Sequence, residues 1–204
     1  MKKVFLVSTL IFCAAAHTTW ADVEIPFLMP IPDGWGTETI HFPLGFAPQL
    51  EYEGFEELRF APGMFEPESE DFWTYAFVWW IPSSSIINGE ILQRDLDAYY
   101  RGLANQPDSP AVQVRINSVE DPAGGSLRFE GTIETIDTFV TQEPVSLTVR
   151  VEVLRCDEQN RVGVFFELSP QPTTHSVWTK LHEIRQGFRC DNPAITPSDS
   201  LGAP

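Results

Sequence analysis

Apolar and polar residues alternate along the second half of the chain in a way that predicts four β-strands. Every second position is apolar and would face a core, while the positions between are polar, as at Arg128, Glu130, Arg150, Glu152 and Glu167. The connections at 121–125 and 156–160 are short, which favours an antiparallel meander because parallel strands need long crossovers. The four apolar sets are Val112, Val114 and Ile116; Leu127, Phe129 and Ile133; Val145, Leu147, Val149, Val151 and Val153; and Val162, Val164, Phe166 and Leu168.

An aromatic run at residues 72–81 predicts a further strand with two apolar faces. One face would carry Trp73, Tyr75, Phe77 and Trp79, and the other Thr74, Ala76, Val78 and Trp80, so we expect cover on both sides. Short strands are also expected at Thr39–Phe42 and 57–60. The acidic clusters 51–57 and 66–71 read as loops or edges.

Two segments have the spacing of apolar residues that is typical of amphipathic helices. The first, 89–103, follows Asn88 as the expected N-cap, and the second covers about 176–188. The chain is therefore predicted to be an α+β protein, in which an antiparallel sheet, made of a four-strand meander plus N-terminal strands, is packed by two helices. The apolar stripes are Ile91, Leu92, Leu96, Tyr99, Tyr100 and Leu103 in the first helix, and Val177, Trp178, Leu181, Ile184 and Phe188 in the second.

The first 21 residues have the layout of a secretory signal peptide. Lys2 and Lys3 precede an apolar run over 4–16, and Thr19-x-Ala21 matches a small-x-small cleavage site. We expect one domain over 22–190, which begins with a Pro-rich arm packed on it, and a mobile tail at 191–204. A periplasmic or secreted location follows, and the apolar run is too short to span a membrane.

The charge of the chain restricts its partners. It is −16 at neutral pH, and loss of Lys2 and Lys3 takes it to −18. Such a field repels nucleic acid and anionic membrane surfaces, while cations and basic partners remain possible. Cys156 and Cys190 would be the two cysteines left after cleavage, and in an exported chain such a pair predicts a disulfide bond. The alternative is two separate buried thiols.

No motif in the sequence defines a catalytic or metal site. The carboxylates of one loop suit calcium by ligand type, but the spacing and the glycine of a calcium-binding loop are missing. A solvated acidic loop is therefore the favoured interpretation of Glu66, Glu68, Glu70 and Asp71. His182 begins a helical H-E-x-x-H-like stretch whose second ligand position is Gln186, so zinc is not expected. No cofactor is therefore predicted.

The aromatic run also suggests a ligand-binding surface. Trp73, Tyr75 and Trp79 would lie on one strand face and could stack against a ligand, although a packed core is the favoured interpretation because the other face of the strand is apolar as well. A hydrolase that uses a pair of carboxylates is the alternative function. Its candidate residues are Glu57, Glu68 and Asp71, near His41.

Two stretches carry a resemblance to known proteins. The order of elements over 50–190, closed by a helix with Trp178, Leu181, Ile184 and Phe188 in a W-x-x-L-x-x-I-x-x-x-F pattern, resembles the PsbP/Mog1-like fold. The stretch 56–80, EELRFAPGMFEPESEDFWTYAFVWW, is similar to a signature of uncharacterised secreted bacterial proteins. The fold resemblance implies a non-catalytic binding or accessory role. An exported binding domain for an unknown protein or small ligand is therefore the expected function.

Overall fold

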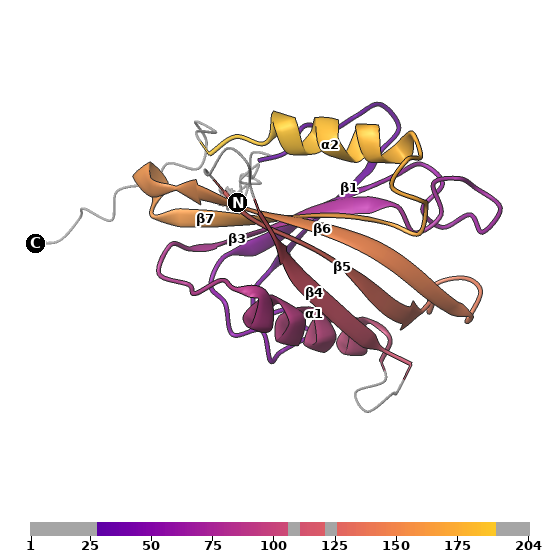
Figure 1. Cartoon of the computed structure of the whole chain (residues 1–204), viewed down its shortest axis with the longest axis horizontal. Coiled ribbons are helices and arrows are strands. Elements are labelled where there is room, and N and C mark those ends of the chain that lie inside the picture. The colour runs from indigo at the N-terminus through magenta and orange to yellow at the C-terminus, as the bar shows by residue number, and fades with distance from the viewer. Residues whose placement is uncertain (1–27, 106–110, 121–125, 191–204) are drawn as a thin grey trace, which may run out of the picture.

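The computed structural model describes residues 28–105, 111–120 and 126–190 (Figure 1). In this part of the chain, seven strands form one sheet in the order β1-β2-β3-β7-β6-β5-β4, and every neighbouring pair is antiparallel. This confirms the predicted α+β class with an antiparallel sheet and two α-helices. The predicted signal peptide and C-terminal tail lie outside the described residues. The elements are β1 (Gly36–His41), β2 (Phe55–Phe60), β3 (Tyr75–Pro82), α1 (Gly89–Leu103), β4 (Gln113–Val119), β5 (Leu127–Ile136), β6 (Pro144–Cys156), the short 3-10 helix η1 (Asp157–Gln159), β7 (Arg161–Ser169) and α2 (Val177–Gly187).

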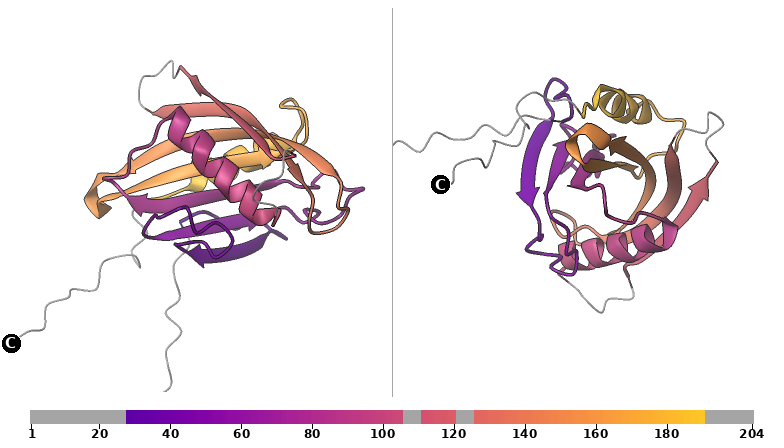
Figure 2. Two further views of the ribbon diagram at one scale, coloured as in Figure 1. Left: turned by 90° about the horizontal axis from the view of Figure 1, so that it is seen from below. Right: turned by 90° about the vertical axis from the view of Figure 1, so that its left-hand side faces the viewer.

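The two helices cover opposite faces of the sheet. The sheet is strongly curved, with α1 on its concave side and α2 on its convex side (Figure 2). Helix α1 packs mainly along β4, and α2 packs along β7 and β3. Each face therefore has its own apolar core, and the central strands β3 and β7 belong to both cores.

Strand β3 is buried on both sides, as its two apolar faces predict. Phe77 and Trp79 point to the α1 side and belong to the larger core. Val78 and Trp80 point to the α2 side and belong to the smaller one. None of these four side chains is more than 2% exposed. The aromatic run is thus mainly a consequence of the position of β3, which lies in a sheet covered by α1 on one face and by α2 on the other.

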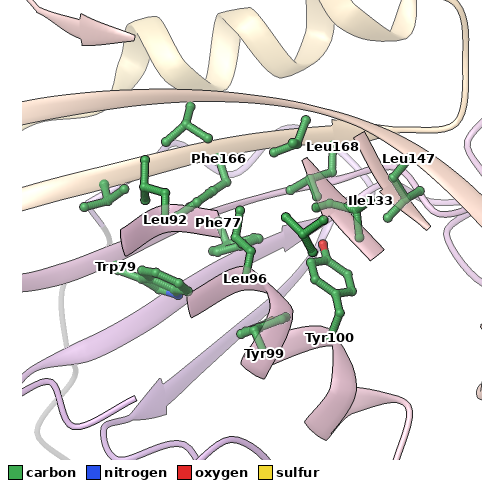
Figure 3. Close-up of a cluster of buried hydrophobic side chains, with 14 of the residues drawn as sticks. Phe77, Trp79, Leu92, Leu96, Tyr99, Tyr100, Ile133, Leu147, Phe166 and Leu168 are labelled. Carbon is green, nitrogen blue, oxygen red and sulfur yellow. The ribbon is translucent and has the colours of Figure 1, made fainter. Parts of the chain in front are cut away.

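The core under α1 is rich in aromatic rings. Phe77 stacks on Tyr99 of the helix at 5.5 Å between ring centroids and on Phe166 of β7 at 4.3 Å. Figure 3 shows these rings with Leu92 and Leu96 between the helix and the sheet. The helix begins at Gly89, and Asn88 Oδ1 accepts a hydrogen bond from Ile91 N at 2.9 Å, so Asn88 is the N-cap that the sequence predicts.

Strand β2 departs from the expected acidic edge. Glu56, Glu57 and Arg59 are at most 1% exposed. Glu57 and Arg59 form an ion pair on the α2 side, where Glu57 also accepts hydrogen bonds from the backbone N–H groups of Leu28 and Met29. The sequence interpretation of 51–57 as a loop or edge is therefore wrong for Glu56 and Glu57. The chain segment that precedes β1 covers this strand and satisfies its charges with backbone groups, which a local charge pattern does not reveal.

The cysteine pair connects the end of β6 to the end of α2. Cys156 and Cys190 are at disulfide distance, with their Cα atoms 5.5 Å apart. That separation lies in the range that a disulfide bond requires. The closing helix therefore docks with its C-terminal end beside the β6–β7 turn, as the predicted disulfide needs.

Candidate ligand-binding site

A cavity of about 440 Å³ opens beside the C-terminal end of α1. Its volume is within the range of about 300–1,000 Å³ that is usual for small-molecule sites. Strands β1 to β3, the β1–β2 loop (42–54), the β2–β3 loop (61–74), the end of α1 and the β5–β6 loop (137–143) contribute its walls. We call it the aromatic cavity because most of its lining is aromatic. Its aromatic residues are Phe46, Phe60, Phe65, Trp73, Tyr75, Tyr99 and Phe139.

Two of the three aromatic residues singled out from the sequence line this cavity. Trp73 and Tyr75 form part of its inner wall, and both are nearly fully buried, at 1% and 2% exposure. Trp79 is not part of the lining. Its indole N–H donates to Glu56 Oε2 at 2.7 Å inside the core, so its role is in packing. Trp73 has a positive φ of 49°, a backbone conformation that places its ring against the loops instead of continuing the strand.

The opening of the cavity is framed by two aromatic side chains that remain half exposed. Phe65 is 48% exposed and Phe139 is 49% exposed, and their rings meet edge-to-face at 5.6 Å. Phe139 also lies 5.6 Å from the Trp73 ring, and Phe65 lies 6.0 Å from Phe60. Clustered exposed aromatic side chains at a concavity are typical of binding surfaces.

The loop that holds Phe139 is fixed by one buried carboxylate. Asp137 Oδ1 accepts hydrogen bonds from the N–H groups of Phe139 and Val140 at 3.0 and 3.2 Å. Asp137 Oδ2 accepts from Thr141 N and Oγ1 at 2.6 and 2.7 Å. These bonds outweigh the effect of burial and lower the pKa of Asp137. The rim of the cavity is therefore built before any ligand arrives.

The β2–β3 loop is equally compact. Successive turns run through it, with Met64 N bonded to Ala61 O and Trp73 N bonded to Met64 O. A Cβ atom on Gly63 would lie 2.0 Å from Ser69 Oγ, so the loop closes on itself at this glycine. Phe65 thus projects from a loop whose backbone is held on both sides.

The charged groups at the aromatic cavity are carboxylates. Glu38 of β1 is the one charged residue in its lining, and it is exposed. Behind the wall lies Glu56, which accepts a hydrogen bond from the Tyr99 hydroxyl at 3.1 Å. Burial, with a smaller contribution from Glu38, raises the pKa of Glu56 to about 7, although the hydrogen bonds from Trp79 and Tyr99 oppose the rise.

A second, polar cavity lies on the other face of the sheet, beside α2. It has a volume of about 370 Å³, and we call it the charged groove. Strands β5, β6 and β7 form its floor, and α2 forms one wall. Its ionisable residues are Glu120, Arg128, Glu130, Arg150, Glu152, Glu167, His182 and Arg185.

Glu167 is the unusual group of the charged groove. It is 6% exposed, although its place on the polar face of β7 predicted exposure, because α2 covers it. Its Oε1 atom has no hydrogen-bond partner among the residues that the structure describes, and the imidazole Nδ1 of His182 lies 3.8 Å from it. Burial raises the pKa of Glu167 to about 7, against the opposing effects of Arg150 and Arg185.

The pKa of the neighbouring Glu152 is shifted in the opposite direction. Arg185 donates to both carboxylate oxygens of Glu152, at 2.8 and 2.7 Å, and Arg128 lies 3.4 Å away. These partners outweigh burial and lower the pKa of Glu152. Glu152 and Glu167 are diagonal neighbours on one face, because Glu152 is opposite Phe165 and Arg150 is opposite Glu167.

The acidic loop of the sequence does not form a metal centre. Among residues 28–105, 111–120 and 126–190, no three His, Cys, Asp or Glu side chains lie together as metal ligands, and Glu66, Glu68, Glu70 and Asp71 fall in this part. Glu70 instead lies 3.7 Å from His175, and Asp71 lies 3.9 Å from Lys180. The loop is therefore directed towards the start of α2.

Of the residues predicted for a hydrolase, Glu57 and His41 are diagonal neighbours on the paired strands β2 and β1, since Glu57 lies opposite Thr39 and His41 lies opposite Phe55. Glu68 and Asp71 lie in the β2–β3 loop. The carboxylate of Glu57 is occupied by Arg59 and backbone N–H groups, which leaves it no role as a base. His41 is exposed and lies at the end of β1, next to the ring of Phe55. The described carboxyls whose pKa values are raised, Glu56 and Glu167, are not among the candidates that the sequence predicts.

Comparison with protein-family models, curated proteins and solved structures finds no match to this chain. The resemblance to the PsbP/Mog1-like fold therefore stays a prediction. None of the helices in the described segments is long and apolar enough to cross a membrane.

Proposed function

We propose that this chain is an exported, non-catalytic protein that binds a small, largely apolar ligand in the aromatic cavity. The main support for this proposal is the exposure of aromatic side chains at the opening of the cavity. Phe65 and Phe139 stay about half exposed at the opening of a 440 Å³ cavity, although the fold has cores on both faces of its sheet. Aromatic area left in contact with water is unfavourable unless a ligand covers it.

The arrangement favours binding over catalysis at this site. The lining offers aromatic and aliphatic side chains with a single carboxylate, Glu38. Nothing in the lining supplies a nucleophile next to a base, which covalent catalysis requires. The hydrogen bonds of Asp137 and the tight turns of the β2–β3 loop keep the opening formed, which reduces the entropy cost of binding.

Export is part of the same proposal. It rests on the signal-peptide pattern of residues 1–21 and on the Cys156–Cys190 pair at disulfide distance, since such bonds persist in oxidising compartments. A PsbP/Mog1-like relationship would agree with a binding role, because the resemblance implies non-catalytic domains.

A titration with N-phenyl-1-naphthylamine, a neutral fluorophore that brightens in apolar sites, tests the proposal. The wild-type protein should bind it at one saturable site. Phe139→Ala should weaken binding about fivefold to tenfold, since one aromatic contact is worth about 1 kcal/mol. Ile86→Ala is the matched control, because Ile86 is 72% exposed and does not line the cavity. Absence of saturable binding, or equal loss in both variants, would refute the proposal.

A carboxylate-dependent hydrolase at the charged groove is the second candidate. One observation favours it: Glu152 and Glu167 are diagonal neighbours whose pKa values are moved in opposite directions. Diagonal neighbours have Cβ atoms about 7 Å apart, so their carboxyl groups can reach the separation of about 6.5–9.5 Å that inverting glycoside hydrolases use. Hydrolysis of a nitrophenyl glycoside that is lost in Glu167→Gln, with fluorophore binding retained, would support it. No turnover across a panel of such glycosides would exclude it.

A further inference from the structure

If the aromatic cavity binds a ligand, as the proposed function states, the charged groups at its opening determine which head group that ligand can carry. The lining residues that are exposed define the opening, and they include the aromatic rings of Phe65 and Phe139 and the carboxylate of Glu38. Among the lining residues that the structure describes, none is a Lys, Arg or His. A negatively charged head group would therefore meet a carboxylate and no compensating cation.

The surroundings of the opening add to this preference. The loop that carries Phe65 continues directly into Glu66, Glu68 and Glu70, which are exposed. Among these three, in the described segments, only Glu70 lies within ion-pair distance of a basic side chain, the imidazole of His175 at 3.7 Å. The charge of the whole chain is −16. An acidic field of this kind raises the local concentration of cations and lowers that of anions at the opening.

Aromatic rings add a specific attraction for one kind of cation. The face of an aromatic ring is electron-rich, and alkylated ammonium groups bind to cages of such rings because their charge is spread and weakly hydrated. Phe65 and Phe139, with ring centroids 5.6 Å apart, provide neighbouring rings at the opening, and the buried ring of Trp73 lies 5.6 Å behind Phe139 in the inner wall. Glu38 supplies the opposite charge.

The inner part of the cavity is lined by apolar side chains and is therefore complementary to a hydrocarbon group. Leu58 and Met64 are 3% exposed and line the cavity with Ile40 and Leu103. A volume of about 440 Å³ is more than a small quaternary ammonium ion would fill. The ligand must therefore carry an apolar body behind its head group.

We propose that the aromatic cavity binds a cationic amphiphile, with its hydrocarbon part inside and an alkylated ammonium head at the rim between Glu38 and the rings of Phe65 and Phe139. Fatty acids and other anionic amphiphiles bind more weakly, because the same groups disfavour a negatively charged head. Neutral amphiphiles of the same length bind with intermediate affinity, because they gain the apolar contact without the charge.

Three probes of equal chain length test this inference: dodecyltrimethylammonium, dodecanol and dodecanoate, each used below the concentration at which it forms micelles. Their affinities are measured by displacement of N-phenyl-1-naphthylamine. The ammonium should bind about tenfold more tightly than the carboxylate. Raising the salt concentration from about 50 mM to about 500 mM should reduce this ratio, since the opening is exposed to solvent.

A pair of variants assigns the preference to the cavity. Glu38→Gln should lower the ammonium-to-carboxylate ratio of affinities about threefold or more, and it should change dodecanol binding less than it changes the binding of either charged probe. Glu90→Gln is the matched control, because Glu90 is an exposed carboxylate at the opposite end of α1. Equal or tighter binding of dodecanoate, with dodecanol bound, would overturn this inference and leave the proposed function intact. Failure of the fluorophore and of all three probes to bind would overturn the proposed function itself.

Discussion

The buried carboxyl of Glu167 makes a quantitative prediction about pH and stability. Its pKa is raised by burial from an ordinary value of 4.5 to about 7, although Arg150 and Arg185 oppose the rise. Glu152 and Glu130 act in the same direction as burial. Between pH 4.5 and 7 the folded protein therefore keeps a proton on Glu167 that the unfolded chain releases. Because the folded state binds more protons in this window, the free energy of unfolding must fall as the pH rises.

The loss of stability follows from the difference between the pKa values of Glu167 in the unfolded and the folded protein. Each pH unit corresponds to about 1.4 kcal/mol, so Glu167 costs about 3 kcal/mol of stability at pH 8 compared with pH 4. Glutamine has the shape of the neutral acid and does not ionise. Glu167→Gln should thus be as stable as the wild type near pH 4.5 and more stable by about 3 kcal/mol at pH 8.

Urea unfolding followed by tryptophan fluorescence at pH 4.5 to 8 measures this difference. Glu56, whose pKa is also raised to about 7, adds a slope of the same sign to both proteins, so only their difference reports on Glu167. Glu158→Gln, an exposed change on η1, is the control and should follow the wild-type curve. Parallel curves for the wild type and Glu167→Gln, or a wild type that gains stability from pH 5 to 7, would refute the reasoning.

The remaining predictions concern the parts that hold the fold and the cavity together. Reduction of the Cys156–Cys190 pair should lower stability by about 4 kcal/mol, since the pair closes a 34-residue loop, and thermal melting with and without reductant measures it. Asp137→Ala should cost about 2–3 kcal/mol and weaken fluorophore binding, because it frees four donors that fix the rim; unchanged binding would contradict the role of the loop. Gly102→Ala should destabilise the protein by about 1–3 kcal/mol in chemical unfolding, since its Cβ would lie 2.0 Å from the backbone oxygen of Phe46.

The elements of the sheet could be predicted because each strand has a regular pattern. In β6, Leu147, Val149 and Val151 alternate with polar residues, and one face of that strand is buried as expected. Asn88 could be predicted as an N-cap because capping depends on a few adjacent residues. These features are local, so the sequence contains what is needed to find them.

The cavity and the buried charges could not be predicted in the same way, because they depend on segments that are distant in the chain. Phe139 meets Phe65 and Trp73 only after the sheet has brought two loops together. The one local sign was the stretch 137–141, where an aspartate that can close a turn precedes two apolar residues. Glu167 looked like a solvent-facing residue of a half-polar strand, since nothing near it in the sequence shows that α2 crosses above it.

A crystal structure of the protein with dodecyltrimethylammonium is the most direct test of the central claim, that the aromatic cavity is the ligand-binding site. The account predicts one ordered molecule, with its chain against Leu58 and Met64 and its head group beside Glu38 and Phe139. An empty aromatic cavity, or ordered ligand only in the charged groove beside Glu167, would contradict it.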